Sequence, residues 1–522
     1  MPPAPAGLPQ RTIEFRSPTY GNFAGGLNTR DYWHTLKDNE LTVARNIRLD
    51  EGGVIRKRGG WAKYISSAVG SAGNLKGVFQ GVWVSAGTVI RAVIATDGVT
   101  VWYESAGSWV NITGAVVLTT TNAALNSFVL FNNLLIGHDG VNAPWQWDGA
   151  AAAISTLAGS PPVGNISIVW QSRLWFAGVG TAQTRLYYSD VNDPAVWGAS
   201  SFIDVPSTFD GDPITGLAVL YGNLIIFKRN SIYIIQGDAP SNFVVSKTNS
   251  AVGCVSPYSV VSVDNLVYFV SDKGLYAMNL SNTKHLAYKV EPNYTRAVKN
   301  QLLSSLARNR IQGIHYRAKN EVWFAIDSTA AGQDQHDRVI AHNYAIVDPD
   351  SGDPAVTEHT MGGAVVAPAV FADYRDPGTG TIAPIASFYD KFVYYFTETA
   401  TNDATAAATA NFSSAFLTGY KDFGDAQATK TLKNIWTSLV FAAGTPTITI
   451  GLLSADFTAE TVATLTPASP STFYNVKQPA GTVFTSARPQ GKYFKFGMTS
   501  ADGGTFSFFQ AAFDVVNNGR RN

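Results

Sequence analysis

Four aspartates in one stretch of the chain could carry glycoside hydrolysis. Asp190, Asp193, Asp210 and Asp212 lie close together in the sequence, and Trp197 stands among them. Hydrolysis of a glycosidic bond uses two carboxyl groups roughly 5 to 10 Å apart, and an aromatic ring can stack on a sugar. Sequence spacing does not establish that these carboxylates converge, so solvated turn residues are the alternative. The segment 189–197 also resembles a sialidase Asp-box, but it lacks the glycine before the aromatic residue.

An acidic run over residues 348–353 and two histidines are the patterns closest to a metal site. Calcium binds clustered carboxylate oxygens. However, Asp353 stands where a helix-loop-helix site needs glycine, and His359 stands where it needs a bidentate glutamate. His336 and His342 have a ligand-like spacing but are typical surface or core histidines. We interpret the acidic run as a turn, with calcium as the alternative, and predict no metal and no cofactor.

Other catalytic patterns are missing from the sequence. It has no G-x-S-x-G elbow, no G-x-x-x-x-G-K-[ST] phosphate loop and no H-E-x-x-H zinc motif. The single cysteine, Cys254, excludes an intramolecular disulfide, a multi-cysteine zinc site and a C-x-x-C pair. We therefore predict that the protein is not an enzyme.

The charge balance restricts the partners of the chain. Its 522 residues include 38 basic and 38 acidic side chains, and only 15% of all residues are charged. Binding of nucleic acid by bulk electrostatics needs uncompensated lysine or arginine, so the composition excludes that class of protein. No signal peptide is visible at the N-terminus, and no apolar run approaches the roughly 18 residues of a membrane span. We expect a soluble protein without membrane insertion, made in the cytosol.

The densest basic run is Arg56-Lys57-Arg58. It lies in a segment, 11–64, that holds ten basic against six acidic residues, a net charge of +4 that the rest of the chain cancels. The run could contact an acidic protein surface or DNA phosphate, or it could be a solvated loop whose arginine stems pack on apolar neighbours. We favour a protein partner over DNA, because three charges give only weak phosphate binding.

A repeated unit of short strands must position these residues. Each copy has an apolar strand, a polar turn and a second apolar strand, at 82–94, 128–137, 168–176, 217–227, 260–269, 314–324 and 385–394. The turns near 132, 171, 222, 264, 319 and 390 are 39, 51, 42, 55 and 71 residues apart, so the last gap requires an insertion. Repeats of about 40 to 50 residues with several strands indicate propeller blades. The sequence predicts an all-β fold with a β-propeller of six or seven blades. Two meander β-sandwiches are the alternative.

Composition divides the chain into three expected parts. Residues 1–70 lack the repeat and are predicted to form an N-terminal arm, and residues 71–398 the propeller. Residues 399–522 are predicted to form a linker and a C-terminal antiparallel β-sandwich, the linker being the Thr- and Ala-rich stretch 397–410. One helix is expected over Pro292–Arg308, where leucines fall at helical spacing after an early proline.

Several segments together resemble a known family. They are Phe23–Arg30, Ala44–Ile47, Gly53–Gly59, Val169–Gly178, Leu186–Asp190, Gly237–Phe243 and Gly253–Pro257. Each is weakly specific, but their order within a propeller-like chain resembles that of the tail nozzle (tail tubular, or tail stabilisation) proteins of short-tailed bacteriophages. The resemblance spans roughly residues 20 to 280.

The resemblance implies a structural virion protein located in the tail and assembled in the host cytoplasm. Family members form a ring, expected here as a homo-hexamer, below the portal and adaptor proteins. The ring extends the DNA ejection channel and meets tail fibres or a needle, so genomic DNA passes transiently. The family-like positions expected to contact other subunits or the adaptor are Phe23, Gly25, Gly26, Asn46, Arg56, Lys57 and Arg58.

Neutrality suits such a conduit, because a lysine-lined wall would grip DNA and slow its passage. Two other classes of protein remain as alternatives. One is a carbohydrate-binding or carbohydrate-cleaving propeller that recognises the host surface. The other is a distal hub or fibre-attachment protein from a different tail type.

Overall fold

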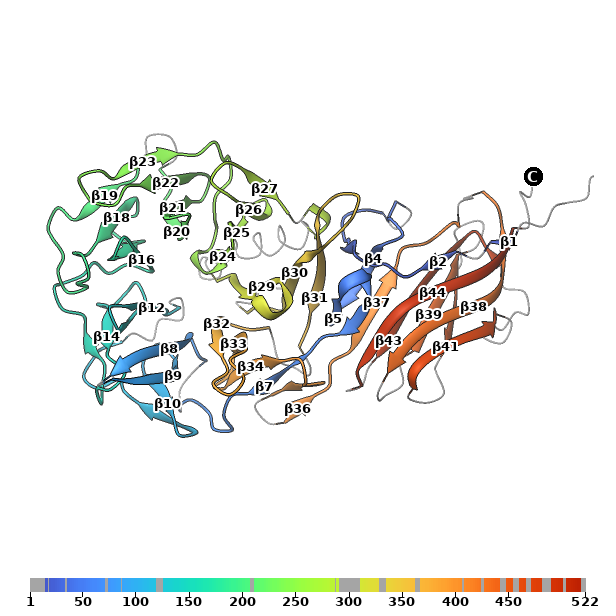
Figure 1. Cartoon of the computed structure of the whole chain (residues 1–522), viewed down its shortest axis with the longest axis horizontal. Coiled ribbons are helices and arrows are strands. Elements are labelled where there is room, and N and C mark those ends of the chain that lie inside the picture. Colours follow the sequence, from blue (N-terminus) through green and yellow to red (C-terminus); the bar gives the residue numbers. More distant parts are fainter. Residues whose placement is uncertain are drawn as a thin grey trace, which may run out of the picture. The chain divides into compact units, whose positions relative to one another are not determined.

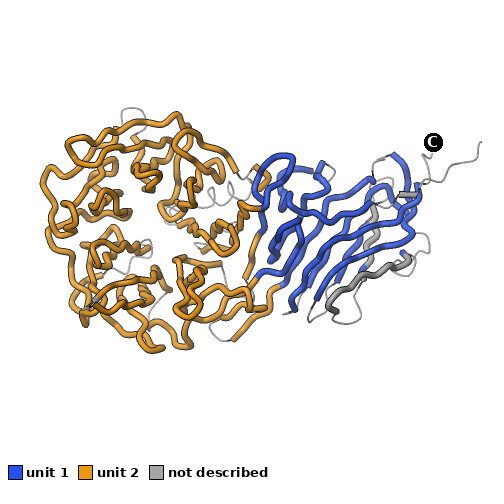
Figure 2. Tube along the Cα trace, viewed as in Figure 1, with its two compact units in different colours: residues 1–58, 346–357, 413–522 blue, residues 59–345, 358–412 orange. Residues whose placement is uncertain are grey.

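The chain folds into two compact units, coloured separately in Figure 2. The sandwich unit comprises residues 1–58, 346–357 and 413–522, and the propeller unit comprises residues 59–345 and 358–412. The computed structural model describes residues 15–16, 18–32, 35–70, 74–85, 87–118, 125–206, 211–286, 288–290, 310–327, 335–361, 367–405, 408–423, 427–441, 447–453, 460–465, 471–480, 490–500 and 504–517.

Over the described residues, the propeller has seven blades of four strands each (Figure 1). Six blades are separate four-stranded sheets, whereas blade 6 is part of a ten-stranded sheet, and residues 346–357 in its last two strands are grouped with the sandwich unit. Blade 1 is β8 (Gly77–Ser85), β9 (Thr88–Thr96), β10 (Val101–Ser105) and β11 (Ser108–Asn111), and blade 2 is β12 (Ser127–Phe131), β13 (Leu134–His138), β14 (Trp145–Trp147) and β15 (Ser155–Thr156). Blade 3 is β16 (Ile166–Trp170), β17 (Arg173–Ala177), β18 (Arg185–Tyr188) and β19 (Phe202–Asp204), and blade 4 is β20 (Ile214–Leu220), β21 (Asn223–Lys228), β22 (Ile232–Gln236) and β23 (Val244–Lys247). Blade 5 is β24 (Val261–Val263), β25 (Leu266–Ser271), β26 (Gly274–Met278) and β27 (Thr283–His285), and blade 6 is β28 (Gln312–Tyr316), β29 (Glu321–Ile326), β30 (Arg338–Val347) and β31 (Pro354–His359). Blade 7 is β32 (Val370–Arg375), β33 (Ile382–Ser387), β34 (Val393–Thr397) and β7 (Gly60–Lys63). The predicted propeller is thereby confirmed, with seven blades.

Tight polar turns create the first hairpins of blades 2 and 3. Asn132 and Asn133 have φ of 48° and 62°, and Gln171 and Ser172 have φ of 50° and 53°. Two consecutive residues with positive φ make a turn whose twist matches that of the flanking strands. The polar residues of these turns are the ones that separate the two apolar strands of each repeat in the sequence.

The ring closes by contact between blade 7 and blade 1. The first strand of each blade contacts the first strand of the next, and β32 of blade 7 contacts β8 of blade 1. The outermost strand of blade 7 is β7, which precedes all the other blades in the chain and pairs antiparallel with β34. A strand from the N-terminal part of the chain therefore completes the last blade.

Blade 7 corrects one detail of the predicted repeat. Residues 385–394 were expected to form a first hairpin, but they belong to β33 and β34, the second and third strands of the blade. The first hairpin lies earlier, joined by residues 376–381, where Asp376 accepts hydrogen bonds from the N–H groups of Gly378 and Thr379. This longer turn lacks the two-residue signature, which is why the sequence pattern pointed to the next hairpin.

The sandwich unit consists of strands from both ends of the chain. One sheet has the order β41 (Ser471–Pro479), β38 (Lys430–Phe441), β44 (Phe506–Asn517), β6 (Ile55–Lys57) and β5 (Ile47–Leu49), and β1 (Phe15–Arg16), β2 (Thr19–Tyr20) and β42 (Gln490–Gly491) also pair with it. In the other sheet, β4 (Glu40–Arg45), β37 (Ser414–Thr418), β43 (Tyr493–Ser500), β39 (Thr447–Leu453) and β40 (Glu460–Leu465) follow in order, with β3 (Gly26–Leu27) beside β4. Phe416 and Phe508, from different sheets, have ring centroids 4.8 Å apart. An aromatic core therefore joins the two faces, as in other sandwiches.

The N-terminal region and the expected linker differ from their sequence-based description. The described residues between 15 and 57 supply strands to both sheets of the sandwich unit, and residues 60–63 supply β7. The expected linker contains a two-stranded ladder, β35 (Asp403–Ala404) with β36 (Thr409–Ala410). Short 3-10 turns occur at Glu51–Gly53, Pro257–Ser259, Tyr288–Val290 and Arg317–Lys319. The helix expected over Pro292–Arg308 lies outside the described residues, and among the described ones no helix has the length and apolarity to cross a bilayer.

Candidate functional site

Asp190 and Asp193 lie together in the loop that follows β18. The Asp190 carboxylate accepts from the N–H of Val191 at 2.8 Å and lies 3.3 Å from the Arg173 guanidinium. The Asp193 carboxylate accepts from the N–H of Ala195 at 2.9 Å. Both carboxylates therefore organise the loop that carries them.

Asp212 lies at the other end of these strands. The N–H of Ile214 donates to the carbonyl of Gln183 at 2.9 Å, which places the start of β20 beside the start of β18, whereas Asp190 follows the end of β18. The Asp212 carboxylate is bonded to the side-chain amide of Asn230 at 2.7 Å. Asp210 lies outside the described residues. Asp212 is therefore separated from Asp190 and Asp193, and the three described aspartates do not gather at one place.

Trp197, the aromatic residue near these aspartates, packs against its own blade. The indole N–H of Trp197 donates to the carbonyl of Pro194 at 2.7 Å, and its ring lies 5.7 Å from that of Phe176. The ring therefore packs on its own blade, so it does not stand free as a platform for a sugar.

His336 and His342 are buried in the propeller unit. His336 Nδ1 lies 2.7 Å from the carbonyl oxygen of Pro368, and the His342 ring packs on Phe324. Burial lowers the pKa of His336 to about 4 and that of His342 to about 3. Both are core histidines, and the described part of the chain contains no group of three His, Cys, Asp or Glu side chains that could hold a metal ion.

The acidic run is an ion-paired turn. The Lys37 ammonium lies 3.2 Å from carboxylate oxygens of both Asp348 and Asp350, and Asn39 donates to the other oxygen of Asp348 at 3.2 Å. Desolvation lowers the pKa of Lys37, but hydrogen bonds to the two aspartates outweigh this effect and hold the pKa above its ordinary value. A lysine thus occupies the position between the carboxylates where calcium would bind.

The first three of the predicted contact residues lie inside the sandwich unit. Phe23 is fully buried, and its ring centroid lies 5.9 Å from that of Phe416. A Cβ atom on Gly25 would come within 2.7 Å of the carbonyl oxygen of Asn39. Gly26 has φ of +63°, and a Cβ there would lie 2.5 Å from the backbone nitrogen of Val356. These positions require glycine because other chain segments pass against their backbone.

The remaining four predicted contact residues surround one turn. Asn46 has φ of 53°, donates to the carbonyl of Ser413 at 2.7 Å and accepts from Arg58 Nε at 3.0 Å. Arg58 and Lys57 are buried. Arg56 alone among the seven residues has a side chain that is more than half exposed, and it pairs with Asp50 at 2.6 Å.

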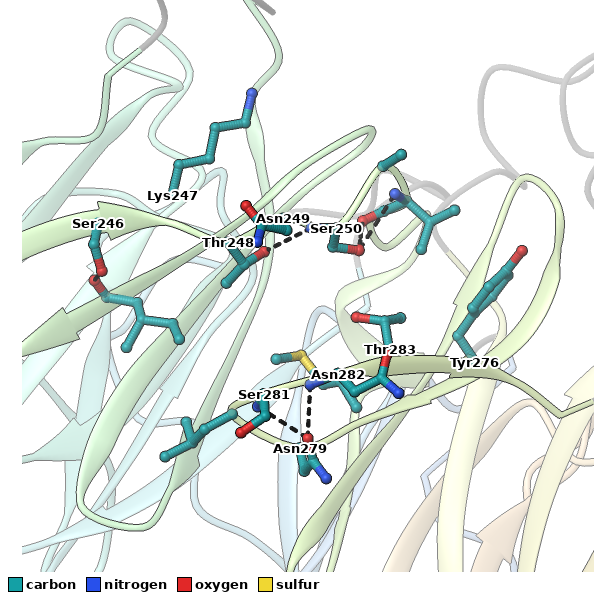
Figure 3. Close-up of a pocket in the computed structure, with 15 residues that line it drawn as sticks. Ser246, Lys247, Thr248, Asn249, Ser250, Tyr276, Asn279, Ser281, Asn282 and Thr283 are labelled. Atoms are coloured by element: carbon teal, nitrogen blue, oxygen red, sulfur yellow. Dashed lines mark hydrogen bonds between the residues drawn. The ribbon is translucent and has the colours of Figure 1, made fainter.

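A groove between blades 4 and 5 was not foreseen from the sequence (Figure 3). Its volume is about 470 Å³, and its lining is Ile234, Ser246–Val252, Tyr276 and Met278–Thr283. We call it the blade 4–5 groove. Its sequence signal is only a local enrichment in Ser, Thr and Asn, which is also the composition of ordinary loops.

Comparison with protein families finds one match. Residues 24–289, just over half of the chain, match the family described as "Bacteriophage P22 Gp10, beta-propeller". The matched range runs from the N-terminal strands of the sandwich unit to the end of blade 5. A search of the curated proteins finds no match.

Solved structures resemble the chain only distantly. A chain of the mitotic checkpoint complex is 13% identical with a TM-score of 0.39, covering 67% of this chain and 98% of that chain. YCF48 from Cyanidioschyzon merolae is 10% identical with a TM-score of 0.38, covering 65% and 98%. PorZ of Porphyromonas gingivalis is 9% identical with a TM-score of 0.39, covering 80% and 46%. Similarity at this level carries no functional implication.

Proposed function

The chain belongs to the family of the bacteriophage P22 Gp10 β-propeller, and from this membership we propose that it forms a closed ring at the distal end of a short phage tail. The family makes it a structural protein of a phage tail. The proposed ring, a homo-hexamer, extends the DNA ejection channel. It attaches to the portal-adaptor protein on one side and to fibres or a needle on the other.

The observation that carries the proposal is the extent of the family match. It includes strands β3 to β6 of the sandwich unit, the closing strand β7 and the first five blades. The likeness therefore extends over parts of both units and does not rest on a generic blade pattern, which many unrelated propellers share.

The charges near the N-terminus agree with a conduit that does not grip DNA. Lys57 and Arg58 are buried in the sandwich unit, and Arg56 is ion-paired with Asp50. Phosphate binding requires several accessible cations acting together. The basic run is thus used within the chain, which supports a role in holding the sandwich unit together.

Native mass spectrometry of the purified chain, alone and with the portal-adaptor protein of the same phage, tests the proposal. We expect a species of six copies that forms in the presence of the adaptor. A chain that stays monomeric at micromolar concentration with and without the adaptor would contradict the proposed ring.

A further inference from the structure

The two walls of the blade 4–5 groove are held by their own hydrogen bonds. On one wall, the Thr248 hydroxyl donates to the carbonyl of Ile232 at 3.0 Å, and the Ser250 hydroxyl donates to that of Val252 at 3.0 Å. On the other wall, Asn279 Oδ1 accepts from the N–H groups of Ser281 and Asn282 at 2.9 and 2.8 Å. The groove is therefore formed before any ligand arrives.

Several polar groups in the groove keep their bonding capacity. Within the described residues, no hydrogen bond occupies the amides of Asn249 and Asn282 or the hydroxyls of Ser281 and Thr283. The Asn279 amide nitrogen also keeps both of its N–H donors, because only its oxygen is used. Figure 3 shows the segment with Asn249 across the groove from Asn279 and Asn282. Amide donors and acceptors thus stand on both sides of the same space.

The lining is almost free of charge. It contains no Asp or Glu, so it does not suit a metal ion. Its one basic residue, Lys247, lies over the Tyr233 ring at 5.9 Å, and a single cation is a poor phosphate site. Ile234, Val252 and Leu280 add apolar surface to the lining. A ligand that fits is neutral, rich in hydroxyl groups and partly apolar.

In the two loops that line the groove, the backbone does not suit an added peptide strand. Strand addition needs a row of unpaired N–H and C=O groups. In the groove, the N–H of Thr248 is bonded to Ile232, that of Asn279 to Asn282 and those of Ser281 and Asn282 to Asn279. Recognition therefore falls to side chains, whose paired amide donors and acceptors match the adjacent hydroxyls of a sugar.

We propose that the blade 4–5 groove binds a neutral oligosaccharide without cleaving it. No carboxylate lies in the lining, so the groove lacks the acid and base of a glycosidase. All of its residues belong to the propeller unit of one chain, so the test does not require an assembled ring.

The test is calorimetric titration of the full-length chain with maltotetraose, cellotetraose and chitotetraose, each up to millimolar concentration. Tetragalacturonic acid and an uncharged Gly/Ser/Thr hexapeptide serve as comparison probes. We expect at least one neutral tetrasaccharide to bind, and the double substitution Asn249→Ala, Asn282→Ala to weaken it by about tenfold or more. Both side chains are exposed, so the double variant should keep the melting temperature of the parent.

Asn265→Ala is the matched control, because this exposed asparagine lies in the same blade but outside the groove. It should leave the affinity unchanged. The proposal is overturned by the absence of binding to all three neutral sugars, by binding of the peptide or the charged sugar alone, or by an affinity that the double substitution leaves intact. None of these results depends on the number of copies in the assembly.

Discussion

At the scale of single residues, the predicted contact positions serve the interior of the sandwich unit. Phe23 contacts Phe416, Phe496 and Phe508, with ring centroids 5.9 to 6.2 Å apart. The sequence pattern singled out Phe23 but did not reveal which side chains surround it, because these three phenylalanines follow 393 to 485 residues later in the chain. Within one chain most of these residues therefore have a role in folding, and Arg56 is the member whose side chain is more than half exposed.

We expect Phe23→Ala to destabilise the sandwich unit by about 3 to 5 kcal/mol, since a large buried ring leaves a cavity. Hydrogen exchange of the peptides from β37, β43 and β44 measures this loss. Tyr32→Ala, at a side chain 77% exposed, is the control and should change stability by less than about 0.5 kcal/mol. Normal protection of these strands in Phe23→Ala, together with lost assembly, would instead make Phe23 an intersubunit residue.

His138 should make the propeller sensitive to acid. Burial lowers its pKa to about 4, against the opposing effects of the Gly164 carbonyl and Asp139. The folded pKa lies below the ordinary value of 6.5, so the unfolded chain takes up the proton first as pH falls. The stability is therefore fully present above pH 6.5 and is lost as pH falls towards 4.

Between pH 7 and pH 5, this one histidine should cost about 2 kcal/mol of unfolding free energy. Urea titrations at the two pH values measure the loss, and the variant His138→Gln should show a correspondingly smaller one. An identical pH dependence in parent and variant would mean that other groups control acid sensitivity.

At the scale of elements, the first hairpins of blades 1 to 6 were predictable, whereas that of blade 7 and the closing strand were not. Local turns such as Asn132-Asn133 specify the pairing of β12 with β13 within a few residues. In contrast, β7 pairs with β34 across more than 300 residues of chain, and no local pattern encodes that pairing. For the same reason, sequence spacing could not locate the aspartates. Asp190 follows the end of β18 and Asp212 precedes the start of β20, so the strands place the two residues at opposite ends.

Trp61 anchors the closing strand. It is 2% exposed, its ring centroid lies 5.4 Å from those of Phe388 and Phe396, and its backbone N–H donates to Asp403 at 3.1 Å. Asp403 belongs to the expected linker, so this stretch helps to hold β7 in place.

We expect Trp61→Ala to cost about 3 to 5 kcal/mol and to open the ring at blade 7. Hydrogen exchange should then rise first in β33 and β34 and least in blades 3 and 4, which lie farthest round the ring. Val89→Ala, at an exposed position in blade 1, is the control. A uniform rise over all seven blades would mean that the propeller opens as one unit, without a weak point at its closure.

At the scale of the whole molecule, the structure shows where basic side chains of the positively charged N-terminal segment lie. The net charge of +4 over residues 11–64 includes Lys57 and Arg58, buried in the sandwich unit, and Lys37, which is paired with Asp348 and Asp350. These three basic side chains of residues 11–64 are therefore engaged within the chain itself. This is what we expect of a protein past which DNA moves without being held.

The most direct test of this account is electron cryomicroscopy of the virion of the phage that encodes the chain, at a resolution that distinguishes propellers. We predict six copies of the seven-bladed propeller in a closed ring at the distal end of the tail, around the channel axis. A virion whose tail end lacks this ring, or in which the propeller occupies another structure, would contradict the proposed function.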